Sequence, residues 1–487
     1  MNKRQPAFYL LVSALVLLLG GLLFGALGGV HYILPGALRE MLPFAKLRPL
    51  HVSMVVFWLL IGASGCIYYI MREQLLRTKL QRVLAFAQAT LLIGVAVGAI
   101  ISYSAGVFGG REYWEFPPYL AIPLSVSWVL FGANFLMAAR RFTGAWPIYY
   151  WQWLCGICFF LFSLAESYLW LLPFFGDHIV RDMTVQWKSY GAIVGSWNML
   201  IYGTAFYLME KISGDSSAAR KPLTFFFFFL GLFNLMFNWG HHIYVLPVSP
   251  AIKHISYVVT MTELLILGKI IYDWKASLTT MQKNFYRLPY RFLAASDVWI
   301  FLNLALALVM SVPAFNLYTH GTHITVAHAM GTTIGINTMI LLASVYYVLG
   351  QIPGARFVQQ YRGIRFGYWL ANASLLIFWL SLIGAGIGKA WLQVQQPNLP
   401  HSLLMQQLWP WFAGFLVSGI GLMAGISVVV IPLLKACFSP VADPEKTPVV
   451  VPVSQVKILG QIDTILQPDT LPVKAKNIPA EAQPASV

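Results

Sequence analysis

The sequence predicts an all-α fold, an integral membrane bundle of twelve transmembrane helices. Of its 487 residues, 58% are hydrophobic, and the mean hydropathy is +0.69. Only 10% are charged, whereas a soluble globular chain carries roughly 25%. Runs of about 20 apolar residues, the length that crosses a bilayer as a helix, recur twelve times. These observations exclude a cytosolic enzyme, a disordered chain, a secreted disulfide scaffold and a simple nucleic-acid-binding protein.

The apolar runs give the expected helices in order along the chain. The first run is too long for a cleaved signal peptide and lacks a small-residue cleavage site, so it is the first span. The sequence contains no internal repeat of the kind that marks many transporters. The expected spans are residues 7–30, 50–71, 83–105, 117–139, 146–173, 187–210, 222–245, 252–273, 290–314, 322–350, 364–388 and 408–436.

Residues 1–436 are therefore expected to form one membrane domain, after which the composition changes. Residues 437–487 contain eight prolines, few aromatic residues and scattered charges, which predicts a Pro-rich polar tail without a packed core. The four cysteines form no disulfide framework. Cys155 and Cys158 make a CxxC inside an apolar run, where packed free thiols are expected.

The formal charge of +15 is explained by topology. Connections on one side of the expected bundle, including the N-terminus, hold eighteen lysines and arginines, and those on the other side hold eight. Because basic residues are retained on the cytoplasmic side of a membrane, both termini are expected to be cytoplasmic. The charge therefore indicates no nucleic-acid partner.

Six of the ten histidines fall at one depth of the expected bundle. One opens the second span, an adjacent pair closes the seventh, and three lie before or just inside the tenth. At a rise of about 1.5 Å per residue, all six lie in the outer third of the bilayer. Ionisable side chains there mark functional sites, so a shared metal or heme site is favoured over structural histidines. The six are His51, His241, His242, His320, His323 and His328.

The spacing of these residues suits metal and heme ligation. Adjacent helical residues are about 100° apart, so His241 and His242 can both lean toward one metal ion. His328 and Met330 are two residues apart and occupy opposite faces of a helix. Such a helix could present ligands to two hemes, since imidazole and thioether both ligate heme iron. Simple packing in the core is the alternative for Met330.

Five stretches carry a resemblance to a known family. They are LRPLHVSMVVFW around His51, GREYWE at 110–115, WGHHIY at 239–244, TELL around Glu263 and THGTHITVAHAMG at 319–331. Over about residues 1–436 the sequence resembles the heme–copper oxidase superfamily, and within it the large, catalytic subunit of cytochrome c-dependent nitric oxide reductase. The resemblance implies a bundle like subunit I of that superfamily.

The resemblance also implies two hemes of b type, one low-spin and one high-spin, and a non-heme metal, iron or copper. His51 resembles an axial ligand of the low-spin heme, and His328 resembles the proximal ligand of the high-spin heme. His241 and His242 resemble two ligands of the non-heme metal. The family's second low-spin ligand is a histidine two residues after the proximal one, and Met330 occupies that position.

Further charged residues match family motifs. Arg111, Glu112 and Glu115 match an outer-loop motif in which a glutamate helps to hold a calcium ion that bridges the heme propionates. Glu263, 21 residues after His242, matches a buried glutamate beside the non-heme metal that can shape its charge or relay protons. A packing role is the alternative for Glu263. A glutamate oxygen as ligand favours iron over copper.

The sixth span departs from the family pattern. The family takes a third histidine ligand from this span, and Tyr190 occupies its position, while Val194 and Asn198 replace two family glutamates. Tyr190 could supply a phenol ligand in catalysis, or it could be an interfacial tyrosine. The seventh span, FFFFFLGLFNLMFNWGHH, lacks the redox-active tyrosine that oxygen-reducing branches place near the metal histidines.

The resemblance implies a respiratory oxidoreductase of a bacterial or archaeal-type inner membrane that reduces NO to N2O. The chain has no CxxCH motif for heme c, so its electron donor is expected to be a separate, membrane-anchored c-type cytochrome subunit. One alternative is a divergent family member with altered gas chemistry or with electron transfer only. A further alternative is a heme-free polytopic transporter.

Overall fold

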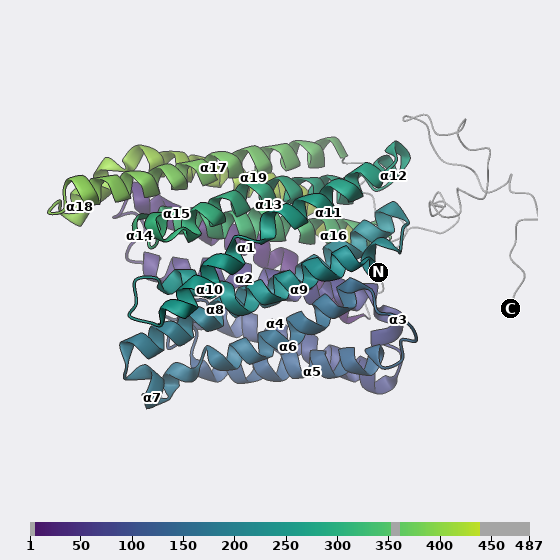
Figure 1. Ribbon diagram of the computed structural model, residues 1–487. Helices are drawn as coiled ribbons and strands as arrows, with labels where there is room; N and C mark the ends of the chain where they lie inside the picture. The colour runs from purple at the N-terminus through teal and green to yellow at the C-terminus, as the bar shows by residue number, and fades with distance from the viewer. Residues whose placement is uncertain (1–4, 352–360, 439–487) are drawn as a thin grey trace, which may run out of the picture.

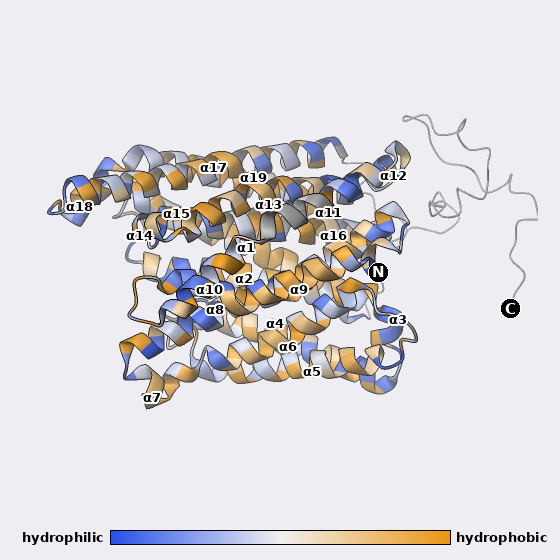
Figure 2. Ribbon diagram, viewed as in Figure 1, coloured by the Kyte–Doolittle hydropathy of each residue, from blue (hydrophilic) through white to orange (hydrophobic). Residues whose placement is uncertain are grey.

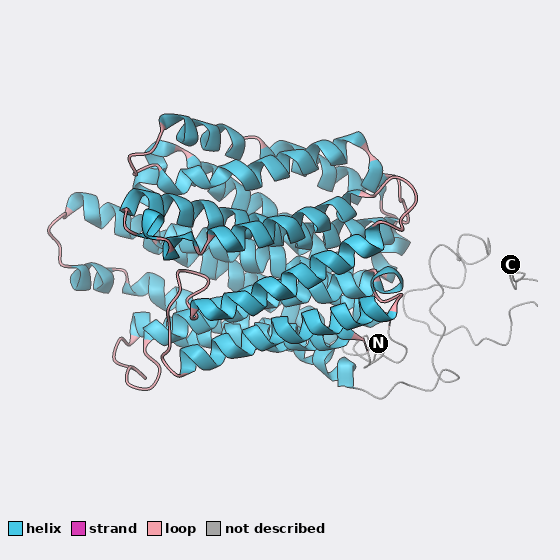
Figure 3. Ribbon diagram, turned by 90° about the horizontal axis from the view of Figure 1, so that it is seen from below, coloured by secondary structure: helices cyan, strands magenta, loops and turns pink. Residues whose placement is uncertain are grey.

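The long helices of the protein lie side by side in a single bundle (Figure 1). The computed structural model describes residues 5–351 and 361–438, except the side chains of residues 263–267, 269 and 361. Within these residues every regular element is a helix, and the β-bridge between Arg111 and Trp114 is isolated. The connecting loops gather at the two ends of the bundle (Figure 3).

Local sequence signals explain where many helices begin. Prolines occupy the first turns of α1, α9, α10 and α14, where their fixed φ suits the helix and their missing N–H costs nothing. The elements in chain order are α1 (Pro6–Ile33), α2 (Phe44–Ile70), α3 (Arg72–Leu75), α4 (Lys79–Ser104), η1 (Pro118–Leu120), α5 (Ala121–Ala139), α6 (Ile148–Glu166), η2 (Leu169–Leu171), α7 (Pro173–Gly176), α8 (Ile179–Ser213), η3 (Ala218–Arg220), α9 (Pro222–Phe237), η4 (Asn238–Ile243), α10 (Pro250–Thr260), α11 (Glu263–Ser277), α12 (Thr280–Phe285), α13 (Arg287–Ser311), α14 (Pro313–Thr319), α15 (His323–Met330), η5 (Gly331–Thr338), α16 (Met339–Gly350), α17 (Tyr361–Gln395), α18 (His401–Gln407) and α19 (Trp409–Phe438).

The expected all-α membrane bundle is confirmed. Eleven helical stretches among the described residues are long and apolar enough to cross a bilayer, and hydrophilic residues gather toward the bundle ends (Figure 2). The expected eighth span, 252–273, is instead divided into α10 and α11 by a turn at Met261 and Thr262. The hydroxyl of Thr262 donates to the Val259 carbonyl at 2.7 Å, which competes with helix continuation at this point.

The first and last spans meet at one end of the bundle. The rings of Phe8 in α1 and Phe438 in α19 pack edge to face, with centroids 6.0 Å apart. The described chain therefore starts and finishes at the same end of the bundle. That this side is cytoplasmic stays a prediction from the lysine and arginine count. Of the predicted tail, residues 439–487 lie outside the described residues.

Glycines bring α1 unusually close to α2. A Cβ placed on Gly20 would lie 2.5 Å from the Met54 side chain, and one on Gly25 would lie 2.6 Å from Nδ1 of His51. Small residues let membrane helices approach closely enough to pack backbone against backbone. The α1–α2 contact therefore depends on these glycines, and Gly25 leaves the space that the His51 ring occupies.

The tenth span contains a π-helical segment. The segment η5 starts directly after Met330 and separates α15 from α16. Nε1 of Trp58 in α2 donates to Oγ1 of Thr338 at the end of this segment, at 3.0 Å. π-Helical turns are rare and occur often at functional sites. Here the segment lies next to two of the predicted heme ligands, His328 and Met330.

Replacing Gly25 with alanine tests the α1–α2 contact. We expect Gly25→Ala to displace the His51 ring and to lower the free energy of unfolding by roughly 1–3 kcal/mol, the usual effect of overpacking. Thermal unfolding in detergent measures the change. Gly94→Ala in α4 is the matched control, since nothing lies within 4 Å of a Cβ built there. An unchanged midpoint for Gly25→Ala would show that α1 and α2 can separate at little cost.

Candidate functional site

His51 is held in one orientation by the backbone of α1. Its Nδ1 lies 2.7 Å from the carbonyl oxygen of Gly21. Because that oxygen can only accept, Nδ1 carries the proton and Nε2 keeps a free lone pair in the neutral ring. Histidines that ligate metals usually donate their other N–H to a carbonyl or carboxylate in this way. The geometry of His51 thus suits axial ligation of a heme.

The adjacent histidines lie on a tight turn, not on the regular α-helix that the sequence predicted. α9 ends at Phe237, and His241 and His242 belong to the 3₁₀ turn η4, where successive residues are about 120° apart instead of 100°. Ser256 of α10 fixes the turn: its hydroxyl donates to the Asn238 carbonyl at 2.5 Å and accepts from the His241 backbone N–H at 2.9 Å. The two imidazole centroids are 4.3 Å apart.

Two more aromatic side chains join this pair. The indole of Trp187, from α8, stacks on His242 with centroids 4.5 Å apart and planes 2° from parallel. His320, in the loop between α14 and α15, approaches both: its ring centroid is 5.7 Å from that of His242 and 5.6 Å from that of Trp187. Segments far apart in sequence thus form one cluster, His241, His242, His320 and Trp187, called here the histidine cluster.

His328 and Met330 lie in the last turn of α15. The Met330 side chain packs against the main hydrophobic core. The Trp58–Thr338 hydrogen bond fixes the register of α2 against this span. The bonded residues Trp58 and Thr338 give the two spans a common reference level. His51 precedes Trp58 by seven residues and Met330 precedes Thr338 by eight, so His51 and Met330 lie at similar depth in the bundle. Their joint ligation of one heme stays a prediction.

Buried ring nitrogens show that these histidines suit a metal or heme. Nδ1 of His241, His242 and His328 and Nε2 of His320 are buried without a hydrogen-bond partner. A buried polar atom without a partner costs about 1–3 kcal/mol, and a bound metal or a cofactor carboxylate would remove that cost. Among the described residues, no three His, Cys, Asp or Glu side chains already converge as a metal site. The cluster is therefore a candidate whose donor atoms must still turn toward one another.

The GREYWE motif builds a compact loop between α4 and η1. The N–H groups of Gly109 and Gly110 both point at the Glu115 carbonyl, at 3.1 and 3.3 Å. A Cβ on Gly110 would lie 1.7 Å from the Trp114 carbonyl oxygen, so only glycine fits. Tyr113 adopts a positive φ of 67°, which is uncommon for a residue with a side chain. The loop thus has a specific conformation that its sequence dictates.

Ion pairs connect this loop to two spans. Arg48, one turn before His51 in α2, pairs with Glu115 and lies 3.7 Å from Glu112. Arg111 donates to Asp182 of α8 at 2.7 Å, and its guanidinium lies 5.0 Å from the ring centroid of Trp170. The cation that the two glutamates contact in this structure is therefore an arginine. The calcium site predicted at Glu112 and Glu115 stays a prediction.

The remaining predicted site residues are not joined to the histidine cluster by the described contacts. The Tyr190 ring packs against Tyr113 with centroids 5.2 Å apart, and its hydroxyl accepts from Gln186 at 3.2 Å. The amide oxygen of Asn198 accepts from Asn337 of η5 at 2.8 Å. Glu263 begins α11, but its side chain lies outside the described residues.

Two residues that the structure places at the site were missed from the sequence. Trp187 is an aromatic residue near the end of an apolar span, which is the ordinary position of an interfacial anchor, so nothing in the sequence marked it. Arg48 counted only toward the charge balance. Its spacing three residues before His51, on the same helical face, was the available signal.

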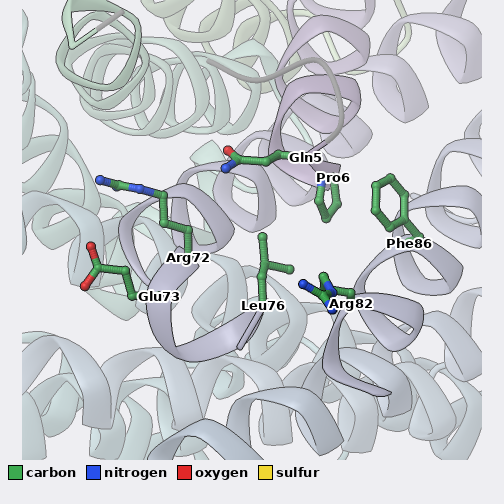
Figure 4. A pocket seen from close by; sticks show the side chains of 7 residues that line it. All are labelled: Gln5, Pro6, Arg72, Glu73, Leu76, Arg82 and Phe86. Carbon is green, nitrogen blue, oxygen red and sulfur yellow. The ribbon is translucent and has the colours of Figure 1, made fainter. Parts of the chain in front are cut away.

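A cavity of about 360 Å3 lies elsewhere in the molecule. Its lining includes Arg72, Arg82 and Phe86 (Figure 4). It adjoins the start of α1 and the short helix α3, at the opposite end of the bundle from α14 and α15 (Figure 1). The cavity contains no histidine, so it is not part of the candidate site. The full lining is Gln5, Pro6, Arg72, Glu73, Leu76, Arg82 and Phe86.

Comparisons with known proteins agree on one family. The family model for cytochrome c and quinol oxidase polypeptide I matches residues 5–420. The chain is 22% identical over 406 residues to a nitric oxide reductase subunit of Stutzerimonas stutzeri, covering 78% of this chain and 83% of that protein. It is 21% identical over 405 residues to cytochrome c oxidase subunit 1 of Rhodobacter capsulatus, covering 78% and 74%. A cryo-EM structure of a heme-copper terminal oxidase dimer shares the fold, with a TM-score of 0.71 at 16% identity over 90% of this chain and 85% of that one.

Removing Arg48 tests its ion pair with Glu115 in the GREYWE loop. Burial raises the pKa of the Glu115 carboxyl, and Arg48 opposes that rise, so the pKa rises further in Arg48→Ala. A carboxyl whose pKa is raised in the folded state stabilises that state at low pH, and this contribution is lost as pH rises through the folded pKa. We therefore expect thermal unfolding in detergent to show a larger loss at about pH 8 than at about pH 5. The loss at the higher pH should be roughly 1–2 kcal/mol, allowing for the partial exposure of Arg48.

Lys46→Ala is the matched control for this experiment. Lys46 lies two residues before Arg48 and donates to the exposed Ser104 carbonyl at 3.2 Å. Its removal should change the midpoint little and equally at both pH values. Equal losses at both pH values for Arg48→Ala would contradict a pairing role for the arginine.

Proposed function

The chain belongs to the cytochrome c and quinol oxidase polypeptide I family, and from its similarity to a nitric oxide reductase subunit we propose that it reduces nitric oxide to nitrous oxide. It is a multi-pass membrane protein of the heme–copper oxidase type. Members of this family bind hemes and a copper or non-heme iron. The family match disfavours the heme-free transporter that composition alone left open.

One observation carries the proposal: histidines from three parts of the chain lie toward one end of the bundle, and several of their ring nitrogens are buried without a hydrogen-bond partner. His241 and His242 present the pair expected of a non-heme metal site. His51 is oriented by its bond to Gly21, and His328 has a buried nitrogen without a partner. An adjacent pair, a proximal ligand and an axial ligand together are the minimum for a two-heme, one-metal centre.

The tyrosines near the site favour nitric oxide over oxygen as substrate. Oxygen-reducing relatives use a tyrosine beside the metal histidines, and α9 has none. Tyr190 packs against Tyr113 of the outer loop. The Tyr244 hydroxyl, just after the histidine pair, donates to the Ser311 carbonyl at 3.1 Å. The described contacts thus leave no tyrosine hydroxyl directed at His241 and His242.

The residues of this chain have separate roles in the proposed reaction. Two NO, two electrons and two protons give one N2O and one water. When bound, the hemes and the non-heme metal would supply the electrons and the electrophilic centre. His51 and Met330 would hold the low-spin heme, His328 the high-spin heme, and His241 and His242 the metal. Glu263 is proposed to shape the charge at the metal or to relay a proton.

The proposed electron donor is a membrane-anchored c-type cytochrome subunit. The similarity to a nitric oxide reductase subunit supports this, and so does the lack of a heme c motif in this chain. The GREYWE loop, fixed by its two ion pairs, lies at the histidine end of the bundle and is the proposed docking element. This end is proposed to face outward and both termini to face the cytoplasm, from the distribution of basic residues.

The altered sixth span supports a second candidate function. Tyr190, Val194 and Asn198 replace one histidine and two glutamates of the family pattern. A site without those ligands could perform a different gas reaction or pass electrons only. The same heme centres would be present in that case, so the two candidates differ in the product formed.

Turnover by the purified protein distinguishes these candidates. We expect membrane-extracted protein to contain two hemes and to co-purify with a c-type cytochrome. It should consume NO and release N2O in a two-to-one ratio when given reduced cytochrome c. Heme-loaded protein that oxidises the donor without consuming NO would support the second candidate. Protein without heme absorbance would refute both.

Replacing Met330 with histidine tests its role as a heme ligand. Thioether ligation raises the potential of a heme relative to two imidazoles, so Met330→His should lower the low-spin potential and retain a low-spin spectrum. Redox titration followed by visible spectroscopy measures the shift. Met339→His, in the fully buried start of α16, controls for a new histidine in the same span. An unchanged potential in Met330→His would show that Met330 only packs in the core.

A further inference from the structure

We propose that the cavity at the start of α1 binds the phosphate group of an anionic phospholipid, whose acyl chains lie along α1 and α4. The cavity is formed where α1, α3 and α4 meet, at the opposite end of the bundle from α14 and α15 (Figure 1). The proposal needs neither a bound metal nor the reaction proposed above. It assigns a ligand to a part of the protein that has no role in the candidate site.

The cavity has the size and the charge to hold a phosphate group with its glycerol. Its volume of about 360 Å3 is within the range of about 300–1,000 Å3 of small-molecule sites. Arg72 and Arg82 line it, and guanidinium groups bind phosphate oxygens through charge-assisted hydrogen bonds. The Arg82 guanidinium has no ion pair or hydrogen bond to the described residues. Figure 4 shows it turned toward Leu76, another lining residue. An anion would supply the partner that this cation lacks.

Arg72 is held in place and still has donors for a ligand. Its Nη1 donates to the Tyr69 carbonyl at 3.1 Å, and its guanidinium carbon lies 4.7 Å from the centroid of the Tyr69 ring. A guanidinium has five N–H groups, so the others can bind an anion. Glu73 also lines the cavity, but it is exposed, and Figure 4 shows its carboxylate turned away from Arg82. Positive charge therefore predominates in the lining.

A buried glutamine fixes α3 relative to the start of α4. The Gln81 side-chain amide donates to the Gln74 carbonyl at 2.9 Å, and Arg141 donates to its amide oxygen at 3.1 Å. Gln81 is fully buried, so water does not compete for these bonds. Arg72 extends from α3 and Arg82 from α4. The backbone of the cavity is therefore in place before a ligand binds.

The chain around the cavity is strongly basic. Residues 72–82 contain four basic residues and one acidic residue, Glu73. Basic segments beside membrane spans attract anionic lipids, and basic pockets between spans bind their head groups. This charge favours an anionic lipid over a neutral one. The basic residues are Arg72, Arg77, Lys79 and Arg82.

An exposed apolar surface continues from the cavity and favours a lipid over a free phosphate ion. Phe86 lines the cavity and is itself exposed, and its ring lies 6.4 Å from that of the exposed Tyr9 in α1. Val16 and Leu23 are exposed at intervals of seven residues after Tyr9, on one face of the helix. This face extends about 21 Å, which exceeds the roughly 15 Å of hydrocarbon in one leaflet. A phospholipid would use both the arginines and this surface.

The test measures lipid binding by the full-length protein. Delipidated protein in a non-ionic detergent at about 0.15 M salt, where distant charges are screened, is titrated with phosphatidylglycerol or with phosphatidylcholine. Native mass spectrometry counts the bound lipids. Phosphatidylglycerol should bind more tightly, and Arg82→Gln should weaken its binding roughly 10-fold, the effect of one hydrogen bond to a charged group. Arg82→Lys, which keeps the charge, should retain most of the affinity.

Two further variants separate the cavity from the general positive charge of the segment. Glu73→Gln removes a negative charge from the lining and should tighten binding roughly 2- to 5-fold, the size of an exposed charge interaction. Arg77→Gln is the matched control: it removes an exposed positive charge outside the lining and should change the affinity less than Arg82→Gln does. Equal losses in Arg77→Gln and Arg82→Gln would overturn the proposal, because the charge of the segment alone would then explain binding.

Competition with inorganic phosphate distinguishes a lipid from a free anion. Phe86→Ser should weaken phosphatidylglycerol binding and leave phosphate binding unchanged. Inorganic phosphate that displaces the lipid at equal concentration, with no effect of Phe86→Ser, would overturn the proposal and assign the cavity to a soluble anion. Equal affinity for phosphatidylglycerol and phosphatidylcholine would also overturn it. Lipid binding that needs Arg82 supports it whether or not the protein reduces NO.

Discussion

The structure depends on one constraint: imidazole rings placed inside an apolar bundle need partners for their ring nitrogens. Water cannot supply them in the membrane interior, and each unpartnered atom costs about 1–3 kcal/mol. The protein satisfies one side of His51 with the Gly21 carbonyl and leaves nitrogens of His241, His242 and His328 without partners. The glycines of α1 and the Ser256 hydroxyl support this arrangement by fixing the backbones that carry the rings. These unpartnered nitrogens lower the stability of the protein, and a bound metal or cofactor would remove that cost.

The sequence predicted the helical class, most of the spans and the end of the bundle where the histidines gather, because these follow from hydropathy and from the rise of a helix. It could not predict the break between α10 and α11, which depends on local hydroxyl bonding at Thr262. Nor could it predict that the histidine pair lies on a 3₁₀ turn. Comparison with the family motif shows that Tyr190 occupies the ligand position in the sequence. The direction in which its side chain packs could not be predicted, because it depends on a contact with Tyr113, which lies 77 residues earlier in the chain.

The GREYWE loop joins the two halves of the candidate site through ion pairs. Arg48 joins Glu115 to the helix of His51, and Arg111 joins the same loop to Asp182 in the helix of Trp187. One side of the loop therefore contacts α2, which carries His51. The other side contacts α8, which carries Trp187 of the histidine cluster. A protein that docks on this loop would lie next to both helices, each of which is joined to the loop by an ion pair.

The π-helical segment has a consequence for how this span can evolve. A π-helix holds one more residue per turn than the surrounding helix, so η5 stores extra chain between α15 and α16. Deleting one residue there would restore an α-helical turn and leave His328 facing the same way relative to α16, because the wide turn of a π-helix takes up the extra residue. The buried half of the span, anchored by Trp58 on Thr338, would stay in place. The chain can thus gain or lose one residue in η5 without unpacking the core and without turning His328 and Met330 to another side of the span.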